Sequence, residues 1–169
     1  MSEVVIRAAR ASDIPRLAAI ETSAADTFVA YGRPLADGSP PSPAEEWDAA
    51  LVAGLLWVAD DAKCGPVGFL RAEVTADGLY IDEVDVRLEH QRQGLGRRLM
   101  RTAIAAAKAR RLPAVTLTTF RDIPWNAPFY ASIGFRELEP AKTSAFLAER
   151  LANQAARGLE DRCAMRLPL

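Results

Sequence analysis

The sequence predicts a single domain of the α/β (α+β) class, built on a mixed, mostly antiparallel, twisted sheet of about seven strands flanked by helices. The length of 169 residues suits one hydrophobic core. Short apolar runs separated by tight turns in the middle of the chain indicate consecutive antiparallel strands. An amphipathic stretch at 97–111 lies between two apolar runs, and this order is typical of a parallel crossover.

The first part of the chain is expected to be a strand followed by two helices. Residues 4–9 form a β-branched run, and Ser12 or Asp13 can cap the helix that follows. The segment 32–43 is rich in proline and glycine and is therefore expected to be a loop. A second helix should follow this loop, with Ser42 as its N-cap.

The rest of the chain alternates between strands and helices. Strands are expected at 55–59, 67–74, 79–86, 115–120, 135–138 and 163–167, and helices from the glycine stretch to about 111, at 127–133 and at 144–157. The link between the fourth and fifth strands is long enough for a parallel crossover, whereas the second to fourth strands should form an antiparallel meander.

Composition excludes several classes of protein. Charged residues make up 25% of the chain and the formal net charge is −1, so no nucleic-acid partner is expected. Cys64, Cys163 and His90 are too few for a His/Cys zinc site, so no metal is predicted. The N-terminus lacks the pattern of a signal peptide and no apolar run is long enough to span a bilayer. We therefore expect a cytoplasmic protein with free thiols and no membrane partner.

A glycine turn between an expected strand and a long helix is the main functional signal. Backbone N–H groups at a helix start bind anions, and glycines let the backbone approach a phosphate closely. The turn therefore predicts a pyrophosphate cradle with arginines to add charge. Its expected ligands are Gln91, Arg92, Gln93, Gly94, Leu95, Gly96 and Arg97. A Walker A loop needs a lysine that is missing here, and a dinucleotide fingerprint needs glycine where Leu99 stands.

The spacing Gln91-x-x-Gly94-x-Gly96 resembles the [RQ]-x-x-G-x-[GA] motif of the GNAT superfamily of N-acetyltransferases. The stretch FYASIGF at 129–135 resembles a second motif of that family. The order of elements matches the family over nearly the whole chain, so residues 1–169 are expected to form one GNAT domain. The resemblance implies splayed strands four and five, acetyl-CoA as co-substrate, and a primary amine of a small molecule or peptide as acceptor.

The resemblance also implies catalytic residues. Tyr130 matches the motif tyrosine and would act as the general acid, since acyl transfer to an amine leaves a thiolate that needs a proton. Asp82 and Glu83 are the candidates for the general base. Strand alternation should place them on opposite faces, and the sequence does not choose between them.

Further cofactor contacts follow from the same resemblance. The backbone of the fourth strand, at Val84, Asp85 and Val86, would bind the pantetheine arm. Many family members have asparagine seven residues before the tyrosine, where this chain has Ile123. Asn126, four residues before Tyr130, is expected among the cofactor-binding residues.

Acceptor specificity in the family depends on the segment between the first two helices and on strand ends. The expected pocket residues are Phe28, Tyr31, Trp47 and Trp125. His90 is expected to be a solvated turn residue without a catalytic role. A homodimer is possible. The alternative function is a non-catalytic acyl-CoA-binding regulatory module on the same fold.

Overall fold

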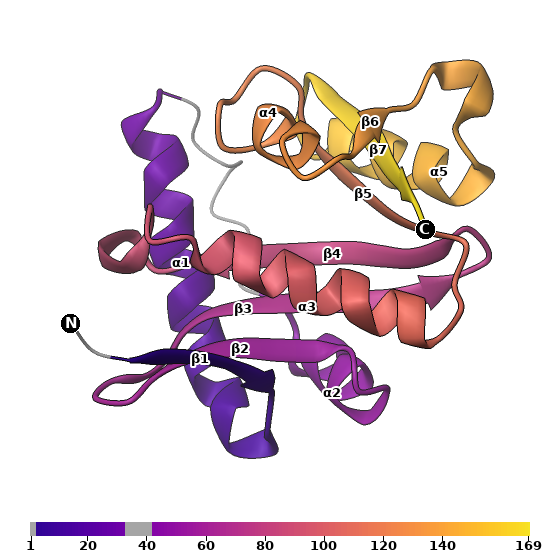
Figure 1. The fold of residues 1–169 in the computed structure, drawn as a ribbon. Helices are drawn as coiled ribbons and strands as arrows, with labels where there is room; N and C mark the ends of the chain where they lie inside the picture. The colour runs from indigo at the N-terminus through magenta and orange to yellow at the C-terminus, as the bar shows by residue number, and fades with distance from the viewer. Residues whose placement is uncertain (1–2, 33–41) are drawn as a thin grey trace. The chain divides into compact units, whose positions relative to one another are not determined.

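The computed structural model describes residues 3–32 and 42–169 (Figure 1). The chain divides into two compact units, one with residues 1–73 and 82–106 and the other with residues 74–81 and 107–169. Seven strands follow the order β1-β2-β3-β4-β5-β7-β6 in one sheet. They are β1 (Val4–Ala8), β2 (Leu56–Asp61), β3 (Gly65–Thr75), β4 (Gly78–Val86), β5 (Ala114–Phe120), β6 (Arg136–Glu137) and β7 (Arg162–Pro168).

The pairings confirm the predicted mixed, mostly antiparallel sheet. β1 pairs antiparallel with β2, β2 with β3, β5 with β7, and β6 with β7. β4 and β5 are parallel, with Leu79–Ile81 opposite Val115–Leu117. The sequence also predicts that these two strands splay apart. Residues 82–86 of β4 belong to the first unit and β5 to the second, so this splay stays a prediction.

Two α-helices of the first unit pack on its strands. η1 (Ala11–Asp13) leads into α1 (Ile14–Ala30), and α2 (Ala44–Val52) lies near the start of the second described stretch. Their apolar faces meet β2 and β3 in one core, because apolar positions at helical spacing point to the same side. Its fully or nearly fully buried members are Leu17, Ile20, Trp47, Ala50, Leu56, Val58 and Phe69.

Neither predicted cap of the first two helices forms. The Asp13 carboxylate instead accepts hydrogen bonds from the Arg10 N–H at 2.8 Å and from Arg7 Nη1 at 2.7 Å. Ser42 does not cap α2, whose N-cap residue is Pro43. The Ser42 N–H and hydroxyl instead both donate to the carboxylate of Glu21 in α1. Hydrogen bonds to a charged acceptor are stronger than the bond to a helical N–H that a cap would make.

The second unit contains the most deeply buried strand. All seven residues of β5 are buried, as expected for a strand covered on both faces. α4 (Ala127–Ala131), η4 (Pro140–Lys142) and α5 (Ala145–Ala156) complete this unit. Ser144 caps α5 by accepting the Leu147 N–H at 3.3 Å. Ala145–Ala156 lies within the predicted range 144–157.

One long helix, α3 (Leu95–Ala109), follows the short η3 turn (Leu88–His90). Leu95, Leu99, Met100 and Ala103 are buried, and the basic side of the helix faces water. In Figure 1, α1 and α3 lie on opposite faces of β2 and β3. Within the described residues, no helix is long and apolar enough to span a membrane.

Candidate functional site: a glycine turn and a carboxylate cluster

The glycine turn begins α3 with open space above its first residues. Gly94 has a φ of 77°, a left-handed conformation that glycine adopts without strain. A Cβ atom at this position would meet no heavy atom of the described residues within 4 Å. The Arg98 N–H donates to the Gly94 carbonyl at 3.1 Å, so the helical hydrogen bonds start here. The preceding N–H groups of the first turn have no intrahelical acceptor, and such groups bind anions.

Side chains from α1 hold the turn in place. Gln91 Nε2 donates to the Val86 carbonyl at 2.9 Å and to Thr27 Oγ1 at 3.1 Å. The Leu88 N–H donates to Ser23 Oγ at 3.1 Å. Gln91 thus links the end of β4 to the glycine turn. Ser23 and Thr27 of α1 stabilise this arrangement through their hydrogen bonds to Leu88 and Gln91. Thr27 and Ser23 were missed by sequence reasoning because a polar residue on a helix face gives no local sign of its partner.

The exposed residues of the turn supply charge around the helix start. Arg92, Gln93 and Gly94 are exposed, and Gly96 and Arg97 are half-buried. Arg92 has a φ of 59°, which is uncommon for a residue with a side chain. Leu95 buries its side chain in the core, so only its backbone can contact a ligand. Arg98 is directed elsewhere, because its Nη2 donates to the Val4 carbonyl at 2.7 Å.

The backbone N–H and C=O groups of β4 point alternately to its two edges, one of which faces β3. The Arg87 N–H donates to Val67 of β3, and the Asp85 carbonyl lies 2.9 Å from the place of a Cβ on Gly68. Asp85 therefore directs its backbone toward β3. Since backbone groups alternate along a strand, Val84 and Val86 direct theirs to the opposite edge. These two residues are the better candidates for backbone bonds to a ligand.

A carboxylate cluster surrounds one buried guanidinium beside β4. Arg71, 6% exposed, places Nη2 2.6 Å from Asp82 and 3.5 Å from Glu83, and Nη1 3.0 Å from Glu46. Its guanidinium also lies 4.5 Å from the centre of the Trp47 ring. Alternation predicts opposite directions for the Cβ atoms of Asp82 and Glu83. One long arginine side chain nevertheless contacts both carboxylates.

Glu83 and Asp85 have pKa values that favour the protonated form. Burial raises the pKa of Asp85 to about 7. Burial also raises the pKa of Glu83 well above its usual value, and the charges of Asp85 and Glu21 add to this effect. A carboxyl group with a pKa near neutrality can exchange protons efficiently at physiological pH. Asp82 instead lies in a close ion pair with Arg71.

In the second unit, Tyr130 and Asn126 occupy α4 and its N-cap position. Tyr130 is 8% exposed and packs edge-on against Phe129 and Phe135. Asn126 Oδ1 accepts a hydrogen bond from Thr119 Oγ1 at 2.9 Å. Asn126 Nδ2 is buried and has no hydrogen-bond partner among the described residues. Thr119 therefore orients an amide whose donor group is still available to a ligand.

The predicted acceptor residues have different surroundings. Tyr31 and Trp125 are 48% and 37% exposed, and Phe28 is half-buried. Trp47 is only 2% exposed and belongs to the core, where its indole N–H donates to the Ser42 carbonyl. Trp47 therefore packs in the core of the first unit, whereas the sequence analysis expected it in the acceptor pocket.

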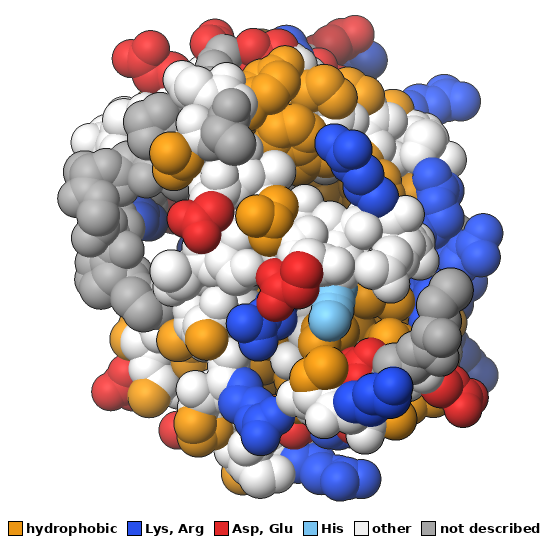
Figure 2. Space-filling model, turned by 90° about the vertical axis from the view of Figure 1, so that its left-hand side faces the viewer, with side chains coloured by type: hydrophobic (Ala, Val, Ile, Leu, Met, Phe, Trp, Pro, Cys, Tyr) orange, Lys and Arg blue, Asp and Glu red, His pale blue; other side chains and the backbone are white. Residues whose placement is uncertain are grey.

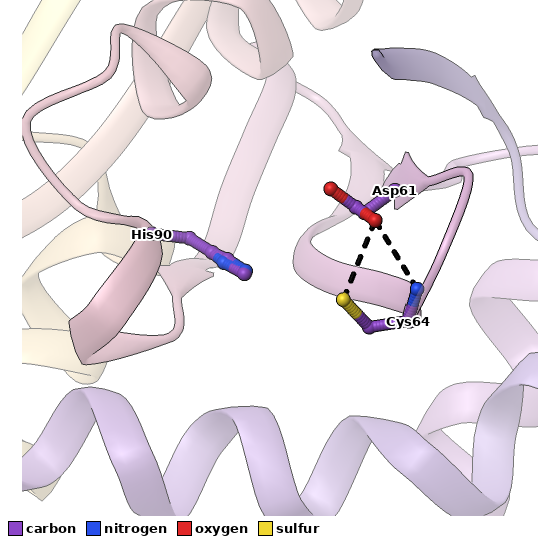
Figure 3. A group of neighbouring side chains, drawn as sticks. All are labelled: Asp61, Cys64 and His90. Atoms are coloured by element: carbon purple, nitrogen blue, oxygen red, sulfur yellow. Dashed lines mark hydrogen bonds between the residues drawn. The ribbon is translucent and has the colours of Figure 1, made fainter. Parts of the chain in front are cut away.

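His90 differs from its prediction. The residue is half-buried in the expected turn, but its two ring nitrogens are buried and have no hydrogen-bond partner in the described part of the chain. The expected solvated imidazole is therefore wrong for these two atoms. Asp61 and Cys64 lie beside it (Figure 3). Cys64 donates from Sγ to Asp61 Oδ1 at 3.3 Å, and this bond raises the pKa of the thiol. The cluster is therefore not an activated nucleophile.

Comparisons with known proteins agree with this geometry. The family model of the acetyltransferase (GNAT) domain matches residues 53–137, which include β4 and the whole glycine turn. The Rv2747 protein of Mycobacterium tuberculosis, solved with coenzyme A, has a TM-score of 0.72 and 21% sequence identity, over 98% of this chain and 99% of that chain.

Two further solved structures share the fold. The ribosomal-protein alanine N-acetyltransferase of Escherichia coli has a TM-score of 0.68 and 20% identity, over 98% of this chain and 94% of that chain. N-acetylglutamate synthase of Neisseria gonorrhoeae, solved with coenzyme A and N-acetyl-glutamate, has a TM-score of 0.71 and 17% identity. The match covers 100% of this chain but only 36% of the synthase.

Proposed function

Because the chain belongs to the acetyltransferase (GNAT) domain family, we propose that it transfers the acetyl group of acetyl-CoA to a primary amine of a small molecule or peptide. The observation that carries this proposal is the open, left-handed Gly94 turn at the start of α3. It supports a pyrophosphate cradle because, among the described residues, no heavy atom lies within 4 Å of a Cβ placed on Gly94, next to the first N–H groups of α3.

The cradle would hold the cofactor through backbone and side chains together. The N–H groups at Gln93–Arg97 would bind the pyrophosphate oxygens, with Arg92 and Arg97 adding charge. Val84 and Val86 would bind the pantetheine arm through their backbones. Asn126 Nδ2, a buried donor oriented by Thr119, would add a further hydrogen bond to the cofactor.

Direct acetyl transfer to an ammonium acceptor requires three proton movements. The ammonium loses one proton, and the neutral amine attacks the thioester carbonyl carbon. The nitrogen of the tetrahedral intermediate then releases a second proton to solvent, the carbon–sulfur bond breaks, and the departing thiolate gains a proton. We assign the first transfer to Glu83, because burial raises the pKa of its carboxyl group and so makes it a stronger base than an ordinary glutamate. Asp82 is the weaker candidate because its carboxylate already lies in a close ion pair with Arg71. Tyr130 would protonate the thiolate, on the strength of its place in the motif.

The carboxylate cluster also bears on the acceptor. The carboxylates of Glu46 and Asp82 both pair with Arg71, and Glu21 adds a further negative charge near Glu83. This excess would attract an ammonium group before it is deprotonated. The named relatives act on an amino acid or on a protein alanine, which supports amine acceptors of this size.

The proposal is tested by screening amines with acetyl-CoA and measuring thiol release. The panel should contain amino acids, diamines, aminosugars and short peptides. We expect thiol release above the hydrolysis background with at least one class, and loss of that signal in the Glu83→Gln variant. Tight acetyl-CoA binding without transfer to any amine would instead favour a non-catalytic acyl-CoA-binding module.

A further inference from the structure

Asp61, Cys64 and His90 bring three different metal-binding groups together in the first unit. Asp61 ends β2, Cys64 lies in the turn between β2 and β3, and His90 ends η3. One carboxylate oxygen, the sulfur and a ring nitrogen all lie within 4.8 Å of one another. Figure 3 shows the three side chains converging from these two turns.

The spacing suits a single transition-metal ion. For three atoms within 4.8 Å of one another, a point exists within about 2.8 Å of each. Bonds from Zn²⁺ to sulfur, nitrogen and carboxylate oxygen are about 2.0–2.3 Å long. Movements of about 0.5–0.8 Å, within the reach of side-chain rotation, would therefore complete three bonds.

The state of His90 is the independent sign of a ligand. Both of its ring nitrogens are buried and lack a hydrogen-bond partner among the described residues. Leaving a buried polar group unsatisfied costs about 1–3 kcal/mol, so such groups usually have a partner. A metal ion bound to one nitrogen would satisfy that atom.

Access and charge are also favourable. Cys64 is exposed, and the histidine reaches the surface of the face shown in Figure 2, so an ion can enter from solvent. A divalent cation would balance the Asp61 carboxylate and a Cys64 thiolate, whose proton passes to solvent on binding. Asp61 Oδ1 also accepts the Lys63 and Cys64 N–H groups, and these bonds fix the carboxylate.

We propose that Asp61, Cys64 and His90 form a zinc-class metal site that is separate from the glycine turn and the carboxylate cluster. Thiolate and imidazole ligands select borderline-soft ions such as Zn²⁺, rather than Mg²⁺ or Ca²⁺. Three protein ligands leave a fourth position for water. The ion would tie the β2–β3 turn to η3, one residue before Gln91.

Cobalt substitution tests this site without reference to catalysis. Untagged full-length protein, kept reduced with a phosphine, is titrated with Co²⁺ and then with Zn²⁺ as competitor. We expect one Co²⁺ per chain and a thiolate-to-cobalt charge-transfer band that Zn²⁺ abolishes. Cys64→Ser should lose the band, and His90→Gln should weaken binding at least about tenfold.

Matched variants separate ligation from general effects. Cys163→Ala removes the other, buried thiol and should keep the band, and Glu89→Gln removes an exposed carboxylate next to His90 and should keep the affinity. Circular dichroism should show that Cys64→Ser is folded. Absence of the band in the folded wild type, or a band that persists in Cys64→Ser, would overturn the proposal.

Discussion

Tyr130 and Tyr80 allow a sharp test of catalysis at the scale of one oxygen atom. Both are buried tyrosines of the second unit, and Tyr80 forms a hydrogen bond with Thr118. We expect Tyr130→Phe to lower kcat by about 10²-fold or more, because general acid catalysis contributes that much. Acetyl-CoA affinity should not change. Tyr80→Phe should lower kcat by less than tenfold, and equal effects in the two variants would show that Tyr130 acts through packing.

Glu83 and Asp82 can be separated by their pH profiles. If Glu83 accepts the proton, the acidic limb of kcat/KM lies above the pH expected for an ordinary glutamate, because burial raises its pKa. Glu83→Gln should lower kcat by about 10²-fold and remove that limb. Asp82→Asn should keep the limb. A profile that loses its limb only in Asp82→Asn would reverse the assignment.

For single residues, the sequence predicted part of the candidate site. It pointed to the glycine turn at 91–97 and to the two acids Asp82 and Glu83. It did not point to Arg71, which contacts three carboxylates, or to Thr119, which orients Asn126. Such partners are far apart in the sequence, and residue type alone does not encode their contacts.

At the scale of elements, α1 supports the glycine turn through Thr27. Thr27→Val keeps the shape of the side chain but removes one of the two acceptors of Gln91 Nε2 named above, the other being the Val86 carbonyl. We expect acetyl-CoA affinity to fall about fivefold, the value of one hydrogen bond of about 1 kcal/mol. Thr22→Val on the same helix is the control, since Thr22 Oγ1 donates to the Ala18 carbonyl within its own helix. Equal affinities in the two variants would contradict a supporting role for α1.

The elements themselves were predicted well where the pattern is periodic. β1, β3, β5 and α3 lie within a few residues of their expected ranges, because alternation and helical spacing follow directly from burial. The caps predicted for the first two helices were wrong. The side chain of Asp13 and the backbone N–H of Ser42 form hydrogen bonds with groups outside their helices. A local motif does not reveal such competing partners.

At the scale of the whole molecule, the buried acids make stability depend on pH. The pKa of Asp85 is about 7 in the folded chain, against 3.8 for a free aspartate. Between these values the folded state binds more protons than the unfolded state, so the free energy of unfolding falls as pH rises. Asp85→Asn should lessen the loss of thermal stability between pH 5 and pH 8. Asp13, whose pKa Arg7 lowers, acts in the opposite direction but only at lower pH.

The most direct test of the account is calorimetric titration with acetyl-CoA of three proteins: wild type, Gly94→Trp and Gly158→Trp. Gly94 and Gly158 have φ values of 77° and 81°, and a Cβ on either meets no heavy atom within 4 Å. The two substitutions therefore impose similar backbone strain, but only the first fills the space above the start of α3. We expect micromolar binding by wild type and Gly158→Trp, and loss of binding in Gly94→Trp. Unchanged binding in Gly94→Trp would contradict the cradle and the function proposed from it.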